Sequence, residues 1–285
     1  MNRKIKEPVS FLLPLIFFIA AFLLFPVLGT FWNSLWHDVP FMARRFVAFD
    51  NYVGLIKDGQ FWQTSFFTIV FACVSVSLEM AFGMITALVL NEKSRLRGAL
   101  RGIALIPWAI PSVIGARIWQ LIFRYDYGVA NITLKAIGIG PVNWLGTSVG
   151  AFAALVLADV WRTTPFVAII LLAGLQTVPD DILKQAQIDG ANIFQRFYRI
   201  TLPMMKPIIM VAILFRTIDA MRVFDLIYVI TGGGPGGTTA SLSVYGYKFF
   251  LTGDFGYGSA VSVILFIIAL TMAVVYIKLG KLRSQ

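Results

Sequence analysis

Six ionisable residues interrupt two stretches of the chain that are otherwise apolar, and their spacing is regular. They are Asp159 and Arg162 in the first stretch, and Arg216, Asp219, Arg222 and Asp225 in the second. Neighbours in each set are three residues apart, so on a helix opposite charges can meet along one slowly turning face and neutralise one another. Two interpretations stay open here. The residues are self-paired scaffolding, or Asp159 and Asp219 accept hydrogen bonds from ligand hydroxyls while Arg162 and Arg216 donate them.

A catalytic or metal site finds little support in the composition. The 285 residues include one histidine, His37, and one cysteine, Cys73, so no His/Cys metal cluster and no Cys-His pair can be assembled. The aspartates alternate with arginines instead of forming an isolated acid and base pair, which fits binding better than hydrolysis. Cys73 itself is expected to be a small buried hydrophobic residue. We therefore expect no enzyme and no metal or cofactor site in this chain.

The elements that must position these charges are membrane helices. Hydrophobic residues make up 58% of the chain and charged residues only 13%, whereas about a quarter of a soluble domain is charged. Several windows without Asp, Glu, Lys or Arg reach the roughly 20 residues that cross a bilayer as helix. The sequence thus predicts an all-α membrane protein, one transmembrane domain over residues 1–285 with six membrane-spanning helices. The spans are expected at about 10–32, 63–90, 101–123, 150–176, 204–230 and 257–279.

The net charge of +10 is explained by membrane topology and not by nucleic-acid binding. With the N-terminus inside, the segments on the inner side carry more than twice as many Lys and Arg residues as those outside. Both termini are therefore predicted to be cytoplasmic. The first apolar run is longer than a signal-peptide core and lacks a small-x-small cleavage site, so it is expected to be a retained anchor.

A polar island, "DDILKQAQIDGANIFQRFYRITLPMMKP", separates the fourth and fifth spans and falls on the cytoplasmic face in this topology. Pro179 and Asp180 supply a helix start, and Gly190 offers the flexible turn that a reversal needs. We predict a helix, a turn and a second helix, with Pro203 and Pro207 near the start of the next span. From periodicity alone, an ordinary amphipathic loop lying on lipid headgroups is the competing interpretation.

The island resembles the EAA loop of ABC importer permeases, a pattern close to E-A-A-x-x-D-G-A followed by F-x-x-I-x-L-P-x-x-x-P. The matching residues are Ala186, Asp189, Gly190, Ala191, Phe197, Ile200, Leu202, Pro203 and Pro207. The glutamate of the pattern is Lys184 here and its first alanine is Gln185, which puts the usual acidic contact in doubt.

By this resemblance, residues 179–203 are a cytoplasmic coupling loop that seats in a groove of a separate ATPase subunit. Short side chains suit the task because a helix approaches a groove closely only where its side chains are small. The residues assigned to coupling are Leu183, Lys184, Ala186, Asp189, Gly190 and Ala191.

The similarity extends along most of the chain, through Pro107 to Ser112, Trp161 to Phe166, and Phe224-Asp225. The run "YVITGGGPGGTT" is similar to the outer loop of MalF-type permeases of carbohydrate ABC importers, so the other permease half is expected to be a MalG-type chain. Residues 231–256 would then be an extracytoplasmic loop. The glycine-rich run has no Lys and no GK[ST], so it is not expected to hold phosphate, and its own chemistry indicates a tight irregular turn.

The resemblance also places the transported sugar about halfway across the membrane. The residues at the matching positions are Trp108, Ser112, Asp159, Arg162, Thr163, Phe166, Arg216, Asp219, Ala220 and Val223. An aromatic side chain such as Trp108 or Phe166 would pack against an apolar sugar face. Outside this set, Glu79 and Arg117 are interpreted as an interhelical pair, with lining of the pathway as the alternative.

The function implied is that of a multi-pass permease subunit in a bacterial or archaeal plasma membrane, importing a disaccharide such as trehalose or maltose. Its expected partners are a second permease, two ATPase subunits that bind ATP and Mg, and an extracytoplasmic solute-binding protein, which would meet outer segments near 37–60, 124–148 and 231–256. Two alternatives stay open: a glycerol phosphate cargo, for which Arg162 and Arg216 would suit, and a secondary transporter or channel with no ATPase.

Overall fold

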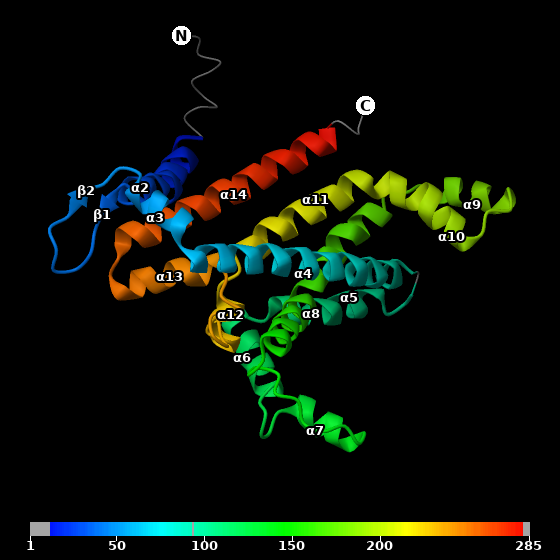
Figure 1. The fold of residues 1–285 in the computed structure, drawn as a ribbon. Coiled ribbons are helices and arrows are strands. Elements are labelled where there is room, and N and C mark those ends of the chain that lie inside the picture. Colours follow the sequence, from blue (N-terminus) through cyan, green and yellow to red (C-terminus); the bar gives the residue numbers. More distant parts are fainter. Residues whose placement is uncertain (1–11, 93, 282–285) are drawn as a thin grey trace, which may run out of the picture. The chain divides into compact units, whose positions relative to one another are not determined.

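The structure, a computed structural model, describes residues 12–92 and 94–281, and nearly all of its regular structure is helical. Figure 1 shows the ribbon coloured along the sequence, with its elements labelled. The internal contacts of the chain divide it into two compact units. The first unit combines residues 1–62 with 245–267, and the second combines residues 63–244 with 268–285. The basic residues of both termini that entered the topology prediction lie largely outside the described residues.

The prediction of six spans is confirmed in number, although two of them are built differently. Five helices in the described part of the chain are long and apolar enough to cross a membrane, and a sixth candidate is a bent pair. The five are Leu12–Asn33, Gly59–Asn91, Ser148–Leu175, Ile193–Met221 and Phe255–Lys278. The bent pair is α5 (Arg97–Ala109) with α6 (Ser112–Ile122), and the two axes differ by 85°.

The first unit begins with the helix Leu12–Asn33, which contains a π-helical stretch, η1 (Ala20–Leu24), followed by α2 (Phe25–Asn33). Two short strands then form an antiparallel hairpin, β1 (Trp36–His37) with β2 (Arg45–Phe46), in which Trp36 is opposite Phe46. Helix α3 (Asp50–Lys57) follows. The amide of Asn51 donates to the carbonyl oxygens of Ser34 and Trp36 at 2.9 and 3.0 Å, and so ties α3 to the end of α2.

Within the same unit, α13 (Leu242–Thr252) contributes Tyr245, whose hydroxyl donates to the carboxylate of Asp58. Burial of the phenol, together with this hydrogen bond, raises the pKa of Tyr245 above its ordinary value of 10.0. The tyrosine therefore stays neutral at ordinary pH and fastens α13 to the loop after α3. Helix α14 (Phe255–Lys281) completes the unit with its first half.

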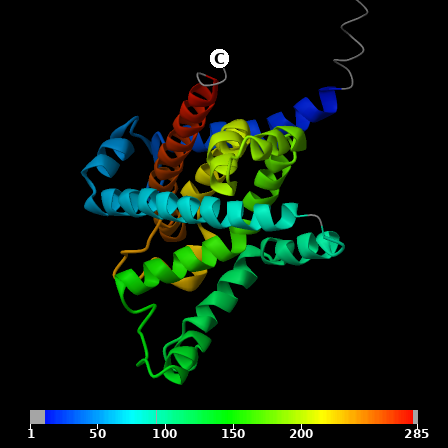
Figure 2. The same ribbon diagram turned by 90° about the vertical axis from the view of Figure 1, so that its right-hand side faces the viewer.

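The second unit is organised around α8 (Ser148–Leu175). Within the apolar part of α8, 61% of the residues are buried, a larger share than in the other four long helices. Its N-terminus is capped by Thr147, whose side chain accepts a hydrogen bond from the amide of Gly150. Helix α8 packs against α5 and against α11 (Leu202–Met221), and α4 (Gly59–Asn91) crosses near it (Figure 2). The buried residues Leu171, Leu175 and Met205 belong to one apolar core between these helices.

A second apolar core lies where α6 packs against α12 (Asp225–Ile230), and it includes Phe71, Leu155 and Ile227. The chain bends between α5 and α6 because Ile110 has an extended backbone, with ψ 130°. Ile110 precedes Pro111, and proline disfavours helical backbone angles in the residue before it. Helix α7 (Val129–Ala136) follows α6. The predicted fifth span also breaks, since α11 ends at Met221 and α12 begins only at Asp225.

Between the fourth and fifth spans lies a hairpin of α9 (Asp180–Ile188) and α10 (Ile193–Arg196), as the sequence predicted. A π-helical stretch, η2 (Phe197–Thr201), joins α10 to α11 without a break. Pro203 lies in the first turn of α11, as expected near the start of this span, and Pro207 lies inside α11. Helical structure nevertheless extends back to Ile193. Proline has no amide hydrogen to give to the preceding turn, and the widened π turn stands directly before Pro203.

One further expectation fails in α4. Cys73 is exposed in this chain instead of buried, because it lies on the outward face of the helix. It lines a largely apolar groove of about 460 Å³ together with residues of α11 and α14. A hydrophobic run marks a residue as part of a span, but it does not say which face of the span packs against neighbouring helices.

Candidate functional site

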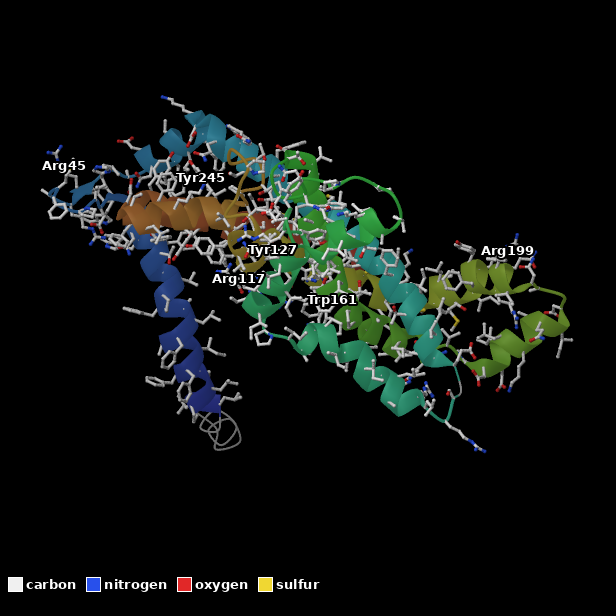
Figure 3. All side chains as sticks on the ribbon, turned by 90° about the horizontal axis from the view of Figure 1, so that it is seen from below. Arg45, Arg117, Tyr127, Trp161, Arg199 and Tyr245 are labelled. Atoms are coloured by element: carbon white, nitrogen blue, oxygen red, sulfur yellow. The ribbon has the colours of Figure 1, made fainter. Side chains whose placement is uncertain are left out.

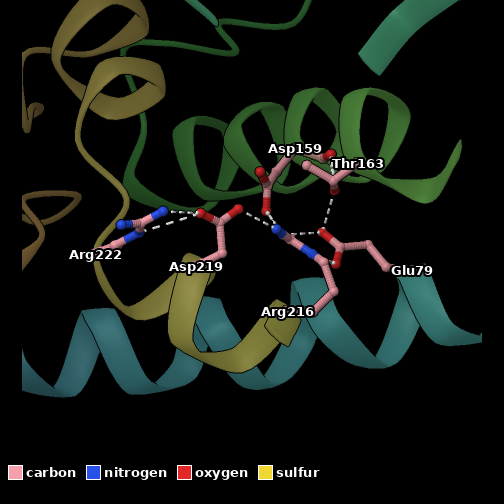
Figure 4. Close-up of polar contacts among 6 residues, drawn as sticks. All are labelled: Glu79, Asp159, Thr163, Arg216, Asp219 and Arg222. Atoms are coloured by element: carbon pink, nitrogen blue, oxygen red, sulfur yellow. Dashed lines mark hydrogen bonds and ion pairs between the residues drawn. The ribbon is translucent and has the colours of Figure 1, made fainter. Parts of the chain in front are cut away.

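Four charged side chains meet near the middle of the second unit, around the guanidinium group of Arg216 on α11 (Figure 4). Arg216 is 2% exposed, and Glu79 on α4 is 0% exposed. Arg216 Nε lies 2.5 Å from Glu79 Oε2, and Nη2 lies 2.8 Å from Glu79 Oε1. Nη2 is also 3.4 Å from Asp159 Oδ2 on α8, and Nη1 is 2.5 Å from Asp219 Oδ2. One arginine therefore joins three helices through three carboxylates.

Two further polar groups extend this charge cluster. Asp219 is half exposed and its second oxygen, Oδ1, accepts hydrogen bonds from Arg222 Nη2 at 3.1 Å and Nε at 3.3 Å. On the buried side, Thr163 Oγ1 lies 2.6 Å from both Glu79 Oε1 and the carbonyl oxygen of Asp159, and it can donate its one proton to either. The cluster therefore runs from a sealed end at Glu79 and Thr163 to an open end at Asp219 and Arg222.

A cavity of about 340 Å³ lies over the open end of the cluster. Its lining is mostly polar, with three aspartates and three arginines among the residues that contact it. The predicted substrate residues that line it are Ser112, Asp159, Arg162, Arg216, Asp219, Ala220 and Val223. Four residues that the sequence did not assign to substrate binding also line the cavity: Arg222, Phe224, Asp225 and Leu226.

The remaining three predicted substrate residues lie elsewhere. Trp108 of α5 and Phe166 of α8 stack on one another, with ring centroids 5.8 Å apart and an interplanar angle of 18°. Thr163 is buried behind the cavity and is bound to Glu79. The structure thus brings the two aromatic side chains together, but it leaves them out of the cavity that the charged residues line.

The pattern of ion pairs differs from the expectation of successive neighbours along each helix. Asp219 does pair with Arg216 and Arg222, both three residues away. Asp159, however, faces Arg216 across the interface of α8 with α11 and not Arg162. Among the described residues the buried Nε of Arg162 has no hydrogen-bond partner. Spacing along a helix identifies groups on one face, but a long arginine reaching across from a neighbouring helix decides the partner.

Two other predicted pairings are wrong for related reasons. Asp225 accepts from Ser112 Oγ at 2.5 Å, since the break after α11 carries Asp225 to the start of α6. Glu79 pairs with Arg216 and not with Arg117. Arg117 lies on α6, beyond the 85° bend that separates α6 from α5, and it donates to Gln120 at 2.5 Å within its own helix. A contact between helices that are distant in sequence leaves no periodic signal that could have revealed the partner of Glu79.

The α9–α10 hairpin forms the other candidate site. Gly190 has φ +84°, a left-handed conformation that favours glycine, and the amide of Ala191 closes the turn by donating to Ala186 O at 2.9 Å. The second helix starts with a capping box, in which Asn192 and Gln195 each accept a hydrogen bond from the other's backbone amide. The turn and the start of the second helix are therefore built from hydrogen bonds local to the hairpin.

Three of the six residues predicted for coupling, Lys184, Asp189 and Gly190, are exposed on this hairpin, and the other three are partly buried. Lys184 forms an exposed ion pair of 3.3 Å with Asp181, so it does not reach another helix. Leu183, one of the partly buried residues, packs against the apolar core of α8 and α11. In Figure 3, Arg199 marks this end of the second unit, far from Trp161 and Arg117.

Sequence reasoning missed the apolar residues that surround the turn. Ile188 is 86% exposed, Ile193 72% and Phe194 73%. Large apolar side chains in such exposed positions mark surfaces that another molecule covers. Their signal was available in the sequence, since Ile188, Ile193 and Phe194 flank a glycine turn that is too short to bury them.

The glycine-rich segment is an irregular turn, as predicted. Four of its glycines, Gly232, Gly233, Gly236 and Gly237, have positive φ values, and Thr239 closes the turn through hydrogen bonds to Thr231 and to the carbonyl oxygen of Gly234. The segment before residue 256 is not irregular throughout, because α13 begins at Leu242. Within the described residues no group of three or more His, Cys, Asp or Glu side chains is placed to hold a metal ion.

Comparisons with known proteins agree with this architecture. Residues 79–279 match the family described as binding-protein-dependent transport system inner membrane component. The chain belongs to this family. It is therefore a membrane-spanning component of an importer and not an enzyme, and importers of this kind combine it with a partner permease, an ATPase and a solute-binding protein. The alternative of a secondary transporter or channel without an ATPase is not supported.

Individual relatives cover almost the whole chain. It is 49% identical over 284 residues to the trehalose/maltose transport system permease protein MalF of Thermococcus litoralis. The matched residues make up 99% of this chain and 96% of the relative. It is 36% identical over 284 residues to the trehalose transport system permease protein SugA of Mycobacterium tuberculosis, covering 98% and 90%. A bacterial alginate ABC transporter, solved with its alginate pentasaccharide-bound periplasmic protein, has a similar chain with a TM-score of 0.83 and 25% identity, covering 96% and 93%.

Proposed function

We propose that this chain is the MalF-type permease half of an ATP-driven importer for a neutral disaccharide, with trehalose or maltose as cargo. The observation that carries the proposal is the 49% identity, over 99% of the chain, to a permease whose name states trehalose and maltose transport. The polar cavity at the charge cluster supplies a place for such a cargo.

The chemistry of the cavity suits hydroxyl groups, each of which both donates and accepts a hydrogen bond. In the proposal, the half-exposed carboxylate of Asp219 accepts from sugar hydroxyls, and Arg162 provides donors nearby. Ser112 Oγ gives its one proton to Asp225, so it is available to the cargo as an acceptor. The three arginines of the lining are matched by three aspartates, and Arg216 is already held by carboxylates. A cavity without surplus positive charge favours a neutral sugar over the runner-up cargo, a phosphorylated polyol such as glycerol phosphate.

The stacked pair of Trp108 and Phe166 takes a revised role in the proposal. Because the two rings cover one another, each keeps only one face free for an apolar sugar surface. The pair serves as a wall beside the polar cavity in the cargo's path.

The α9–α10 hairpin is proposed to be the coupling loop, within residues 179–203, that docks in a groove of the ATPase. Ala186, Asp189, Gly190 and Ala191 form the close-approach turn, and Lys184 stands where the EAA pattern has glutamate. The exposed Ile188, Ile193 and Phe194 supply apolar contact area. Leu183 links the hairpin to the apolar core, so that movement of the hairpin shifts α8 and α11.

The assembled importer is proposed to contain this chain, a MalG-type permease, two ATPase subunits and a solute-binding protein, in the plasma membrane of a bacterium or archaeon. ATP and Mg are bound by the ATPase subunits alone. Both termini and the hairpin are assigned to the cytoplasm, and the outer loop of residues 231–256 to the opposite side, where the binding protein docks. Closure of the ATPase pair on ATP moves the hairpins inward and opens the permeases outward to receive the sugar, and hydrolysis resets them.

The identity of the cargo is tested by uptake into vesicles that contain the complete importer. Labelled trehalose is offered with an excess of unlabelled trehalose, maltose or glycerol phosphate. We expect the two disaccharides to suppress uptake and glycerol phosphate to leave it unchanged. Suppression by glycerol phosphate, with ATP-dependent uptake of labelled glycerol phosphate, would contradict the proposed cargo.

The cavity is tested by Asp219→Asn, which removes a charge but keeps the shape of the side chain. We expect trehalose binding to the assembled importer to weaken by about tenfold, since a hydrogen bond to a charged group contributes roughly 1.5–3 kcal/mol. Asp126→Asn, at an exposed position after α6, is the matched control and should bind like the wild type. Loss of assembly, in place of weaker binding, would favour the scaffold interpretation of Asp219.

A further inference from the structure

We propose that Glu79 is a positioning residue for the cargo: it sets the orientation of Arg216, and through Arg216 it keeps the carboxylates of Asp219 and Asp159 available in the cavity. The inference rests on the proposed function, because it concerns the same cavity. Glu79 lies on α4, outside the residues that line the cavity, and its side chain is fully buried. It therefore cannot touch the cargo and acts only through its neighbour.

The geometry of the contact is specific. Both oxygens of Glu79 bind Arg216, one at Nε and the other at Nη2, at 2.5 and 2.8 Å. A two-point contact of this kind fixes the plane of a guanidinium group, which a single hydrogen bond does not. With that edge occupied, Nη1 is left to face Asp219 at 2.5 Å, while Asp159 receives only the longer contact of 3.4 Å from Nη2.

The consequence concerns the free acceptor sites of the cavity. Asp219 is bound by Arg216 through one oxygen and by Arg222 through the other, and a carboxylate has about four acceptor positions, so some remain for sugar hydroxyls. If the charge of Glu79 is removed, Arg216 is released and Asp159 and Asp219 are its remaining carboxylate partners among the described residues. Both line the cavity. Arg216 would turn toward them and occupy acceptor positions that the cargo needs.

A purely structural role for Glu79 predicts something different. Buried ion pairs often contribute little net stability, yet removal of one partner is costly because the other charge is left without compensation. In that case a substitution at Glu79 lowers the amount or the thermal stability of the assembled importer, but those molecules that assemble bind cargo normally. Affinity per assembled complex therefore distinguishes positioning from scaffolding.

The experiment uses the complete importer in nanodiscs with a non-hydrolysable ATP analogue. The binding protein is omitted, so that the measured trehalose binding comes from the permease cavity alone. Equilibrium dialysis with radiolabelled trehalose gives the dissociation constant for wild type, Glu79→Gln, Glu79→Asp and Asp219→Asn. Glu79→Gln is expected to raise the dissociation constant by about tenfold. Glu79→Asp keeps the charge on a shorter side chain, so its value should lie between those of the wild type and Glu79→Gln.

Thr68→Val is the matched control on the same helix. Thr68 is also fully buried, and its hydroxyl accepts a hydrogen bond from the amide of Leu242 at 2.9 Å, in a part of α4 that does not line the cavity. The substitution removes a buried polar contact without touching Arg216. It is expected to lower thermal stability while the dissociation constant for trehalose stays within twofold of the wild type.

A wild-type dissociation constant in Glu79→Gln, with weakened binding in Asp219→Asn, would overturn the role of Glu79 and leave the proposed cavity intact. Equal binding by the wild type and Asp219→Asn would instead contradict the proposed cavity. Where Glu79→Gln does not assemble, Glu79→Asp decides alone: a rise of threefold or more supports positioning, and a wild-type value overturns it.

Discussion

The charge cluster around Arg216 and the hairpin of α9 and α10 lie in the same unit but differ in which side chains they bury and which they expose. In the cluster the charged groups bind one another, and the central pair, Arg216 and Glu79, is 2% and 0% exposed. In the hairpin, apolar groups are exposed, with Ile188 86% and Phe194 73% exposed. The cluster is satisfied within this chain, whereas the hairpin presents a surface that only another molecule can cover.

This difference separates what the chain specifies for itself from what the assembly must supply. The cluster depends on α4, α8 and α11 being packed correctly, so changes in it should affect folding and cargo binding together. The hairpin is held by its own turn and capping box, so changes on its surface should affect the attachment of the ATPase and leave the permease folded. Substitutions in each region test this difference.

The largest effect is expected from Arg216→Ala. Without the guanidinium group, the carboxylates of Glu79, Asp159 and Asp219 remain near one another with no shared counter-charge. Breaking a buried pair in this way costs on the order of 3–5 kcal/mol. The yield of monodisperse importer and its thermal unfolding temperature should both fall sharply, as measured by size-exclusion chromatography and a thermal shift assay in detergent.

Arg222→Ala is the internal control for Arg216→Ala, since it removes the same residue type from the same partner, Asp219. The side chain of Arg222 is 70% exposed, and exposed ion pairs contribute about 0–1 kcal/mol. Its importer should assemble almost normally. Equal losses of stability in both variants would show that burial does not distinguish the two ends of the cluster.

A smaller effect, confined to coupling, is expected from Phe194→Asp on the hairpin. Phe194 is 73% exposed, so the isolated permease should unfold at the wild-type temperature. If Phe194 is an anchor of the ATPase contact, its loss should weaken binding by about 2 kcal/mol or more, close to thirtyfold. The measurements are co-purification of the ATPase and ATP-driven trehalose uptake.

Ile137→Asp provides the matched control for Phe194→Asp. It places the same charge at another exposed apolar residue, 67% exposed, directly after α7 and away from the hairpin. Retention of the ATPase is expected there. Normal retention by Phe194→Asp as well would remove the apolar face of the hairpin from the coupling surface.

The sequence predicted the fold and the hairpin well because both depend on local signals. Long apolar windows identify spans, and Gly190 between two short helical patterns identifies the turn. Most of the cavity residues were also predicted, since Asp159, Arg216 and Asp219 are costly in a membrane helix unless a site or a partner explains them.

The partners of these charges could not be predicted in the same way. Arg216 pairs with Glu79, 137 residues away in sequence, because α4 and α11 pack together. The spacing of residues along either helix does not predict that contact. The break after Met221 likewise brings Asp225 to Ser112, although the hydrophobic pattern continues through residue 230. The sequence thus identified which residues needed partners, but only the packed structure showed which partners they have.

The smallest effect tests the turn itself and compares Gly190→Val with Gly190→Asn. At φ +84° a β-branched side chain is strained by roughly 1–2 kcal/mol, whereas asparagine tolerates this conformation. Among the described residues other than its two chain neighbours, no atom lies within 4 Å of a Cβ added at Gly190, so steric clash within the permease does not separate the two variants. If coupling needs only the shape of the turn, Gly190→Asn should transport like the wild type and Gly190→Val about tenfold more slowly. If the ATPase groove approaches Gly190 closely, both variants should lose uptake, since asparagine is also larger than glycine. Wild-type uptake by Gly190→Val would contradict a coupling role for the turn.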